Sequence, residues 1–266
     1  MATSTTPAPR AEPVDPHAPR LTGPRLMNQD WRDLLYVHWA VEPARLVSFM
    51  PPGVRPDEHE GLTYVGLVPF RMVDAGFGPR SSVPFFGTFL ETNVRLYSMD
   101  ERGRRGVVFL SLDADRLAVV LGARASLGIP YRWATMSHAA TAPTPADQGG
   151  DGVAGAVHAY RSRLRRRVRV GRPEGRTDVR VRVGAARTPT PLDHFVSARW
   201  RLHTGVLGRT IVVPNQHEPW PLHEATLEHL DAEVLASVGL PELVDREPDH
   251  VAFSPGVHTE FGLPRR

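Results

Sequence analysis

The sequence predicts an α+β fold built mainly on antiparallel β-sheet. Short runs of alternating apolar and polar residues recur along the chain with turn residues between them, which is typical of antiparallel strands. Helical periodicity is confined to a few segments. Residues 1–24 are rich in Pro, Ala and Thr and lack any apolar period. We therefore expect residues 1–24 to be a disordered tail and residues 25–266 to form a single domain.

The first half of the chain is predicted to be mostly strands. Segment 88–99 alternates strongly, segments 62–73 and 106–114 also read as strands, and residues 100–104 form a hairpin turn between the last two strands. A short helix is expected between Glu42 and Pro51, because a proline at its start and a proline pair at its end favour those boundaries. His38 lies in the apolar run LLYVHWAV, which predicts a core histidine with satisfied hydrogen bonds rather than a metal ligand.

The second half mixes helices and strands. Residues 115–128 have helical spacing and end at Gly128, and residues 190–202 are predicted as a helix capped by Thr190. Residues 208–213 read as a strand. Residues 223–240 suit a helix, although their first half also suits a strand. Two alternating strands are expected within 164–183, and the Gly-rich segment 141–156 is expected to be a flexible loop.

The composition excludes several chemistries. All 32 basic residues are arginine, and the chain has no cysteine, so Schiff-base lysines, disulfides and thiolate nucleophiles are absent. The pI near 9.8 is weak evidence for nucleic-acid binding, because a small positive excess made of arginine is neutralised only where tyrosine ionises. We find no signal-peptide pattern and no apolar run of ~18 residues, so we expect a cytoplasmic protein without a membrane span.

A row of polar residues on one predicted strand is the strongest functional signal. Alternation over 89–97 places Glu91, Asn93, Arg95 and Tyr97 on one face. Such a set could line a polar cavity in which Arg95 holds a carboxylate and Glu91 acts as acid or base, with its pKa set by the arginine and by burial. The alternative is an ordinary solvated strand face with a Glu91–Arg95 contact.

Other motifs give weaker signals. The segment HEPWPLH brings His217, Glu218 and His223 close in sequence, but its prolines break helical spacing and no HExxH occurs. We expect no metal, and we expect His217 and Trp220 to belong to a packed, hydrogen-bonded turn. No dinucleotide fingerprint, P-loop or nucleophile elbow is present, so no cofactor is predicted.

An arginine-rich hairpin is predicted over 161–183. One face carries arginine and the other mostly valine, as on a basic ribbon that could follow a phosphate backbone. Edge strands also use charge to prevent aggregation, and in a chain without lysine that charge is arginine. We favour this second interpretation, so a nucleic-acid partner is not expected. The arginines concerned are Arg165, Arg167, Arg169, Arg180 and Arg182.

Several segments in order resemble the YqjF-like proteins of the acetoacetate-decarboxylase-like superfamily. The matching stretches span roughly residues 26 to 264 and are MNQDWRDLLYVHWAV, FMPPGV, YVGLVPFRM, FLETNVRLY, GVVFLSLDA, ARASLGIPYRWA, HEPWPL and ASVGLP. The resemblance implies an antiparallel β cone or barrel with packed helices around a pocket. Decarboxylases of the superfamily are oligomers, so it also leaves a homo-oligomer open.

The resemblance also bears on the chemistry. The decarboxylases carry a Gly-Phe-Pro-Lys-Lys stretch whose first lysine forms the Schiff base. The similar stretch here is 128–132, where Tyr131 replaces that lysine and Arg132 replaces its neighbour. Glu91 matches the pocket glutamate of the decarboxylases. The pocket frame is therefore expected without the covalent chemistry.

Three functions follow from these observations. The favoured one is a protein that binds a small carboxylic or apolar metabolite through Asn93, Arg95, Tyr97 and Arg132. The second is an enzyme of the lyase or isomerase type that acts without a covalent intermediate on a keto acid, with Glu91 and Tyr131 as acid–base groups. The third is a nucleic-acid binder that uses the arginine hairpin.

Overall fold

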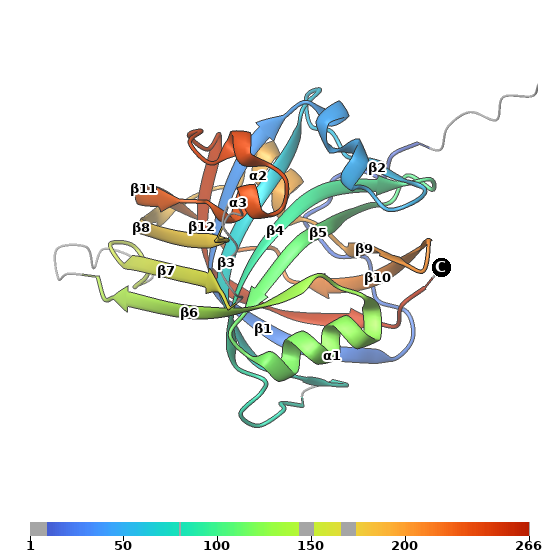
Figure 1. Cartoon of the computed structure of the whole chain (residues 1–266), viewed down its shortest axis with the longest axis horizontal. Helices are drawn as coiled ribbons and strands as arrows, with labels where there is room; N and C mark the ends of the chain where they lie inside the picture. The colour runs from blue at the N-terminus through green and yellow to red at the C-terminus, as the bar shows by residue number, and fades with distance from the viewer. Residues whose placement is uncertain (1–9, 80, 144–151, 166–173, 266) are drawn as a thin grey trace, which may run out of the picture.

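The structure is a computed structural model that describes residues 10–79, 81–143, 152–165 and 174–265 (Figure 1). Its strands belong to one sheet. They are β1 (Arg25–Val41), β2 (Val54–Pro56), β3 (Thr63–Phe77), β4 (Phe89–Asp100), β5 (Arg105–Ala114), β6 (Tyr131–Thr141), β7 (Val157–Leu164), β8 (Arg176–Ala186), β9 (Arg201–Val206), β10 (Arg209–His217), β11 (His223–Asp231) and β12 (His250–Gly262). The helical elements are short and comprise η1 (Pro43–Phe49), α1 (Leu117–Leu127), α2 (Pro191–Ser197), α3 (Val234–Ser237) and η3 (Pro241–Leu243).

The strand order of the sheet is β10-β9-β5-β6-β7-β8-β11-β12-β1-β3-β4-β2, with additional pairings β10–β12 and β5–β4. These two pairings join strands that are distant in the order, so the sheet curls back on itself. Most neighbours are antiparallel, whereas β5 pairs in parallel with β6 and β9. The predicted strand-dominated α+β class is confirmed.

The predicted strands of the first half are confirmed, and so are the helix over 115–128 and the strand over 208–213, whereas other elements of the second half need correction. Helix α1 ends at Gly128, which adopts the left-handed conformation expected of a C-cap. The segment after Glu42 is a 3-10 helix rather than an α-helix. Thr190 caps α2 in a capping box with Asp193, but the helix ends at Ser197 because the chain then enters β9 and pairs with β10.

The helix predicted over 223–240 is wrong for its first half. Residues His223–Asp231 form β11, as the strand alternative allowed, and only Val234–Ser237 are helical. Pairing of β11 with β8 supplies cross-strand hydrogen bonds that outweigh the helical spacing of the apolar residues. The predicted arginine hairpin begins earlier than expected, since β7 pairs with β8, and residues 166–173 lie outside the described residues.

The prediction of a disordered tail is wrong for residues 10–24. Glu12 accepts hydrogen bonds from Arg105 and Arg201, and its backbone N–H donates to Gly103 O at 2.9 Å. Leu21 is buried. These contacts hold residues 10–24 against the domain, although the segment has no apolar periodicity. Residues 1–9, and residues 144–151 of the predicted loop, lie outside the described residues.

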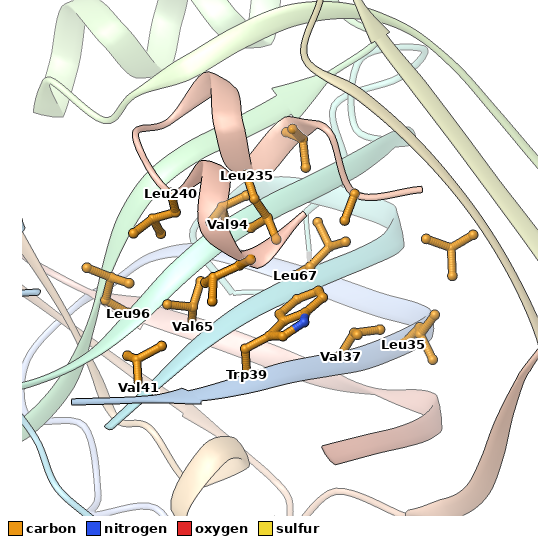
Figure 2. Close-up of a cluster of buried hydrophobic side chains, with 14 of the residues drawn as sticks. Leu35, Val37, Trp39, Val41, Val65, Leu67, Val94, Leu96, Leu235 and Leu240 are labelled. Atoms are coloured by element: carbon orange, nitrogen blue, oxygen red, sulfur yellow. The ribbon is translucent and has the colours of Figure 1, made fainter. Parts of the chain in front are cut away.

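The two faces of β1, β3 and β4 line different interiors. One face packs Trp39, Val65 and Leu96 against α3 and its neighbour η3 (Figure 2). The opposite face carries Tyr36 and Tyr97 toward α2 and the 217–222 turn. This second interior contains the polar row of β4. No helix in the described part of the chain is both long and apolar enough to cross a bilayer.

Candidate functional site

Four neighbouring strands place a row of paired residues side by side. His250 on β12 pairs with His38 on β1, His38 pairs with Gly66 on β3, and Gly66 pairs with Arg95 on β4. Adjacent strands lie about 4.8 Å apart, so side chains at paired positions on one face come into contact. The register of the sheet therefore builds the centre of the site.

Gly66 leaves the space that this row needs. A Cβ atom at Gly66 would lie 2.9 Å from Nε2 of His38 and 3.3 Å from Cγ of Arg95. With hydrogen in that place, His38 reaches across β3 to β4, where its Nε2 lies 2.6 Å from the Tyr97 hydroxyl oxygen. The glycine is explained by close packing of side chains rather than by backbone conformation.

Arg95 is buried without a carboxylate. Its Nε donates to the Tyr97 hydroxyl at 3.1 Å and its Nη2 donates to Val196 O at 2.8 Å. The guanidinium carbon also lies 5.3 Å from the centre of the Tyr36 ring. Among the described residues, no Asp or Glu forms an ion pair with Arg95. Arg199, in contrast, is equally buried and holds Asp57 at 2.5 Å.

A chain of hydrogen bonds leads away from Tyr97. Nδ1 of His38 lies 3.0 Å from Nδ1 of His250, and Nε2 of His250 lies 2.8 Å from Oδ1 of Asp193. Burial is the first cause that lowers the pKa of His38 well below its usual range, followed by the neighbouring His250 and Arg95. His38 is thus the satisfied core histidine that the sequence predicted.

Glu91 forms a second polar centre with Tyr131. The Tyr131 hydroxyl donates to Oε2 of Glu91 at 2.7 Å. Burial raises the pKa of Glu91 to about 7, although hydrogen bonds from Tyr131 and Asn93 lower it. Burial also raises the pKa of Tyr131 well above its usual range. Arg95 is not among the causes, so the expected influence of the arginine on this pKa is wrong.

The predicted site residues thus fall into groups. Glu91 and Tyr131 meet, and so do Arg95 and Tyr97, but no hydrogen bond or ion pair of the described residues joins Glu91 to Arg95. Four residues of strand span about 13 Å, which explains the separation. The alternative prediction of a solvated strand face is wrong, because the Glu91 and Arg95 residues are only 3% and 7% exposed.

Arg132 does not join either group. Its guanidinium donates to both oxygens of Asp113, at 2.5 and 3.1 Å, and to the Ser237 hydroxyl on α3 at 2.9 Å. Alternation along β6 points Tyr131 and Arg132 to opposite faces, because successive side chains of a strand alternate. Arg132 therefore ties β5 to α3 in the other interior.

Several buried polar atoms near the site have no hydrogen-bond partner among the described residues. They include Trp31 Nε1 and Trp220 Nε1 of the apolar cluster that contains Phe70, and Asn93 Oδ1 on β4. An unpaired buried polar group costs roughly 1–3 kcal/mol. These atoms are hydrogen-bonding groups that the described residues leave unused.

A small hollow lies beside this cluster. It is lined by Ser197 and Ala198 at the end of α2, by Trp220, and by Pro16 of the N-terminal segment, together with His194, Pro189, Pro219 and Leu222. Trp220 packs with its ring edge on Tyr36 at 5.5 Å, and Val196, next to Ser197, accepts the hydrogen bond from Arg95. Trp220 and Ser197, which line the hollow, are therefore neighbours of residues that Arg95 contacts.

Side chains of the other sequence motifs contact neighbouring residues of the chain. His217 Nδ1 donates to Glu218 O at 2.7 Å, and Trp220 is buried, as predicted for a packed turn. On the arginine face, Arg180 and Arg182 both hold Glu228, at 2.7 Å each. Arg165 bonds to the Thr135 hydroxyl at 2.8 Å. Arg167 and Arg169 lie outside the described residues.

Sequence reasoning missed His250, Asp193 and Gly66 as parts of the site. His38 and His250 are 212 positions apart in the chain, so no local pattern connects them. Only the pairing of β12 with β1 brings them together. A glycine in the middle of an apolar strand was the one available signal, because it often marks a close approach of another group.

Comparisons with known proteins agree with this fold. A solved acetoacetate decarboxylase-like enzyme from Sphingomonas wittichii RW1 superposes with a TM-score of 0.59 at 16% identity, covering 91% of this chain and 92% of its own. Acetoacetate decarboxylase from Legionella pneumophila gives 0.54 at 14% identity, covering 98% and 94%. The enduracididine biosynthesis enzyme MppR in complex with pyruvate gives 0.54 at 17% identity, covering 92% and 91%. The protein therefore has an acetoacetate-decarboxylase-like fold.

Within that class, the chain belongs to the DUF2071 family, described as an uncharacterized conserved protein, whose profile matches residues 28–258. It is also similar to the uncharacterized protein YqjF of Bacillus subtilis (strain 168). The two share 27% identity over 203 residues, which cover 76% of this chain and 77% of YqjF. The predicted resemblance is confirmed.

Proposed function

We propose that this protein binds a small carboxylate in the second interior, with Arg95 as its anchor. The observation that carries the proposal is the buried guanidinium of Arg95, whose hydrogen-bond acceptors are both uncharged. A buried charge without a counter-ion is costly, whereas a carboxylate can meet arginine in a bidentate pair. The ligand would therefore supply the negative charge that the described residues do not.

The surroundings of Arg95 favour a ligand with an apolar part. Trp31, Tyr36, Phe70 and Trp220 belong to the apolar cluster on this side of the sheet, and the indole N–H groups of Trp31 and Trp220 are unused by the described residues. Such a mixture of aromatic walls and few polar groups is typical of small-molecule sites. We propose that the curved sheet forms a cone or barrel around this interior, and that the hollow at Trp220 is its entrance.

The similar fold of MppR supports a small acid as ligand, since pyruvate is a carboxylate and is bound by that protein. Schiff-base chemistry is not part of the proposal, because the chain has no lysine. Arg132 is not part of it either, because its guanidinium is held by Asp113.

Acid–base catalysis on a keto acid is the second candidate. It is favoured by the Glu91–Tyr131 pair, because a carboxyl group whose pKa is about 7 can give or take a proton near neutral pH. Tyr131 stays protonated and could donate a hydrogen bond to an enolate. A substrate held by Arg95 would have to extend along about four residues of β4 to reach Glu91.

A thermal-shift screen tests the first candidate. Wild type, Arg95→Met and the surface control Arg180→Met would each be heated with pyruvate, lactate, butyrate or hexanoate. A ligand at about 100 times its Kd adds roughly 2.7 kcal/mol of stability. We expect a rise in Tm for wild type and control that is absent in Arg95→Met. A stabilising acid that acts equally on Arg95→Met would refute the anchor, and no stabilisation by any acid would refute the carboxylate ligand.

Following the stabilising acid by NMR separates the two candidates. Turnover that Glu91→Gln abolishes would make the protein an enzyme. Binding without any product leaves it a binding protein.

A further inference from the structure

The buried row of hydrogen bonds from Tyr97 through His38 and His250 to Asp193 has a defined direction, in the sense that donor and acceptor can be assigned in each bond. Two neutral imidazoles whose Nδ1 atoms lie 3.0 Å apart share one proton between those atoms. Asp193 lies 2.8 Å from Nε2 of His250 and, when ionised, accepts a proton from it. Nδ1 of His250 is then an acceptor, Nδ1 of His38 is a donor, and Nε2 of His38 accepts from the Tyr97 hydroxyl at 2.6 Å.

The surroundings of Asp193 maintain this direction. Its carboxylate accepts from the backbone N–H and the hydroxyl of Thr190, each at 2.8 Å, and it forms an ion pair with Arg187. Hydrogen bonds from His250 and Thr190 lower the pKa of Asp193 and outweigh the effect of burial. In the reverse direction Nε2 of His250 would carry no proton and would face the carboxylate at 2.8 Å, so two acceptors would oppose each other. Arg187 Nη2 lies farther from Nε2, at 3.3 Å, and its closer contact is with Asp193.

The other end of this row of hydrogen bonds meets the ligand anchor. The Tyr97 oxygen accepts from Nε of Arg95 at 3.1 Å, and the Arg199 guanidinium lies 4.9 Å from the centre of its ring. Val196 O lies 3.1 Å from the same oxygen and competes for its proton. The shorter contact to His38, and the direction set by Asp193, assign that proton to His38. The hydroxyl thus has a proton acceptor on one side and the anchor on the other.

We propose that Tyr97 is the acid–base residue of the Arg95 site, and that His38, His250 and Asp193 are positioning residues that relay its proton. The acid–base role rests on the proposed carboxylate site, while the direction of the relay does not. The substrate class would be a carboxylate with an acidic hydrogen nearby, on C3 of a 2-oxo acid or on the hydroxyl group of a 2-hydroxy acid. These are the acids whose carboxylate Arg95 can hold while Tyr97 meets the neighbouring group.

The proton transfer balances within the chain. Tyr97 takes the acidic proton of the substrate while its own proton passes to Nε2 of His38. The proton on Nδ1 of His38 passes to Nδ1 of His250, which becomes an imidazolium paired with Asp193. Tyr97 stays neutral at the start and the end, and the substrate is left as an anion beside Arg95. The reverse sequence returns the proton.

NMR of the full chain labelled with ¹⁵N-histidine tests the relay without any ligand. We expect His38 to be protonated at Nδ1 and His250 at Nε2 near pH 7, with a scalar coupling between the two Nδ1 nitrogens. Tyr97→Phe should keep that coupling and change the Nε2 signal of His38 selectively, with little change at His217. The opposite pair of tautomers, or no coupling between the rings, would overturn the relay.

Exchange of the methyl hydrogens of pyruvate in D₂O tests the acid–base role. We expect wild type to exceed the buffer rate at least tenfold, and Tyr97→Phe to lose that excess while pyruvate still raises its Tm. His38→Gln should reduce the rate and flatten its pH profile. Equal exchange by Tyr97→Phe, or no exchange by wild type, would overturn the role. If pyruvate, lactate, butyrate and hexanoate all leave the Tm of wild type unchanged, the proposed carboxylate site is refuted as well. A Tm shift without exchange refutes only the acid–base role of Tyr97.

Discussion

Arg95, which is buried, and Arg132, which is partly buried, lie on opposite faces of one sheet and differ in what holds their charge. Arg132 donates to both oxygens of Asp113, which is fully buried. Arg95 has a phenol and a peptide carbonyl as its acceptors. The sequence suggested a ligand-binding role for both. The structure distinguishes them, because Arg132 has its counter-ion within the fold and Arg95 does not.

We infer that Arg132 serves stability, whereas Arg95 serves ligand binding. A buried ion pair is complete without a ligand, and removing one partner is expensive. A buried cation without an anion carries a cost that a bound carboxylate can repay. The same substitution at the two positions should therefore have different effects on stability.

The largest expected effect is that of Arg132→Met. It removes the guanidinium that pairs with the buried Asp113, so the free energy of unfolding should fall by about 3 kcal/mol. This value is near the lower end of the range for breaking a buried ion pair, because Arg132 is partly exposed. Arg95→Met should change the free energy of unfolding by less than about 1 kcal/mol, because among the described residues Arg95 has no ion pair with a buried carboxylate that the substitution would break. Urea denaturation at pH 7 measures both. Equal losses at the two positions would remove the distinction.

These two residues show how much of the site could be predicted from the sequence. Alternation correctly placed Glu91, Asn93, Arg95 and Tyr97 on one buried face, because burial and period are local properties. The strand β6 was not predicted, so alternation was not applied to Tyr131 and Arg132, and the pairing of β6 with β5 that brings Arg132 to Asp113 is parallel and non-local. Nor could alternation find His250, because the register between β1 and β12 is set by contacts across most of the chain.

The second effect concerns the other end of the polar row, where a buried carboxyl has no cation beside it. The pKa of Glu91 is raised to about 7 from 4.5, so its folded state keeps a proton that the unfolded chain has lost. The stability that this gives is present below pH 4.5 and is lost as the pH rises through 7. Glu91→Gln should therefore stabilise the protein by up to about 3 kcal/mol at pH 8.

The same variant should differ little from wild type at pH 4.5, because both side chains are then neutral and both accept from Tyr131. Urea denaturation at the two pH values gives the comparison. A gain of equal size at both pH values would show that packing, rather than ionisation, is responsible. A loss at pH 8 would show that the ionised carboxylate is stabilised in the fold.

A third prediction addresses the gap between His38 and Arg95. Gly66→Ala places a methyl group 2.9 Å from Nε2 of His38, so one of the two side chains must move. Overpacking of this kind costs about 1–3 kcal/mol. Gly205→Ala is the matched control on another strand, where the new Cβ meets its nearest neighbour, Pro51 Cβ, at an ordinary 3.5 Å. Both would be measured by thermal unfolding, and the ¹⁵N signals of His38 should move only in Gly66→Ala. An unchanged His38 with normal stability would mean that Gly66 does not keep the row open.

The smallest effect is expected on the arginine face of β8, where the charge is exposed. Arg180 is 57% exposed and shares Glu228 with Arg182, so Arg180→Ala leaves the carboxylate with its second partner. The loss of stability should be under about 1 kcal/mol and should shrink in 1 M salt, because exposed pairs are screened. Urea denaturation at low and high salt measures it. A larger loss of stability that salt does not reduce would mean that the charge of Arg180 acts like a buried charge. That result would contradict the distinction between surface and interior arginines.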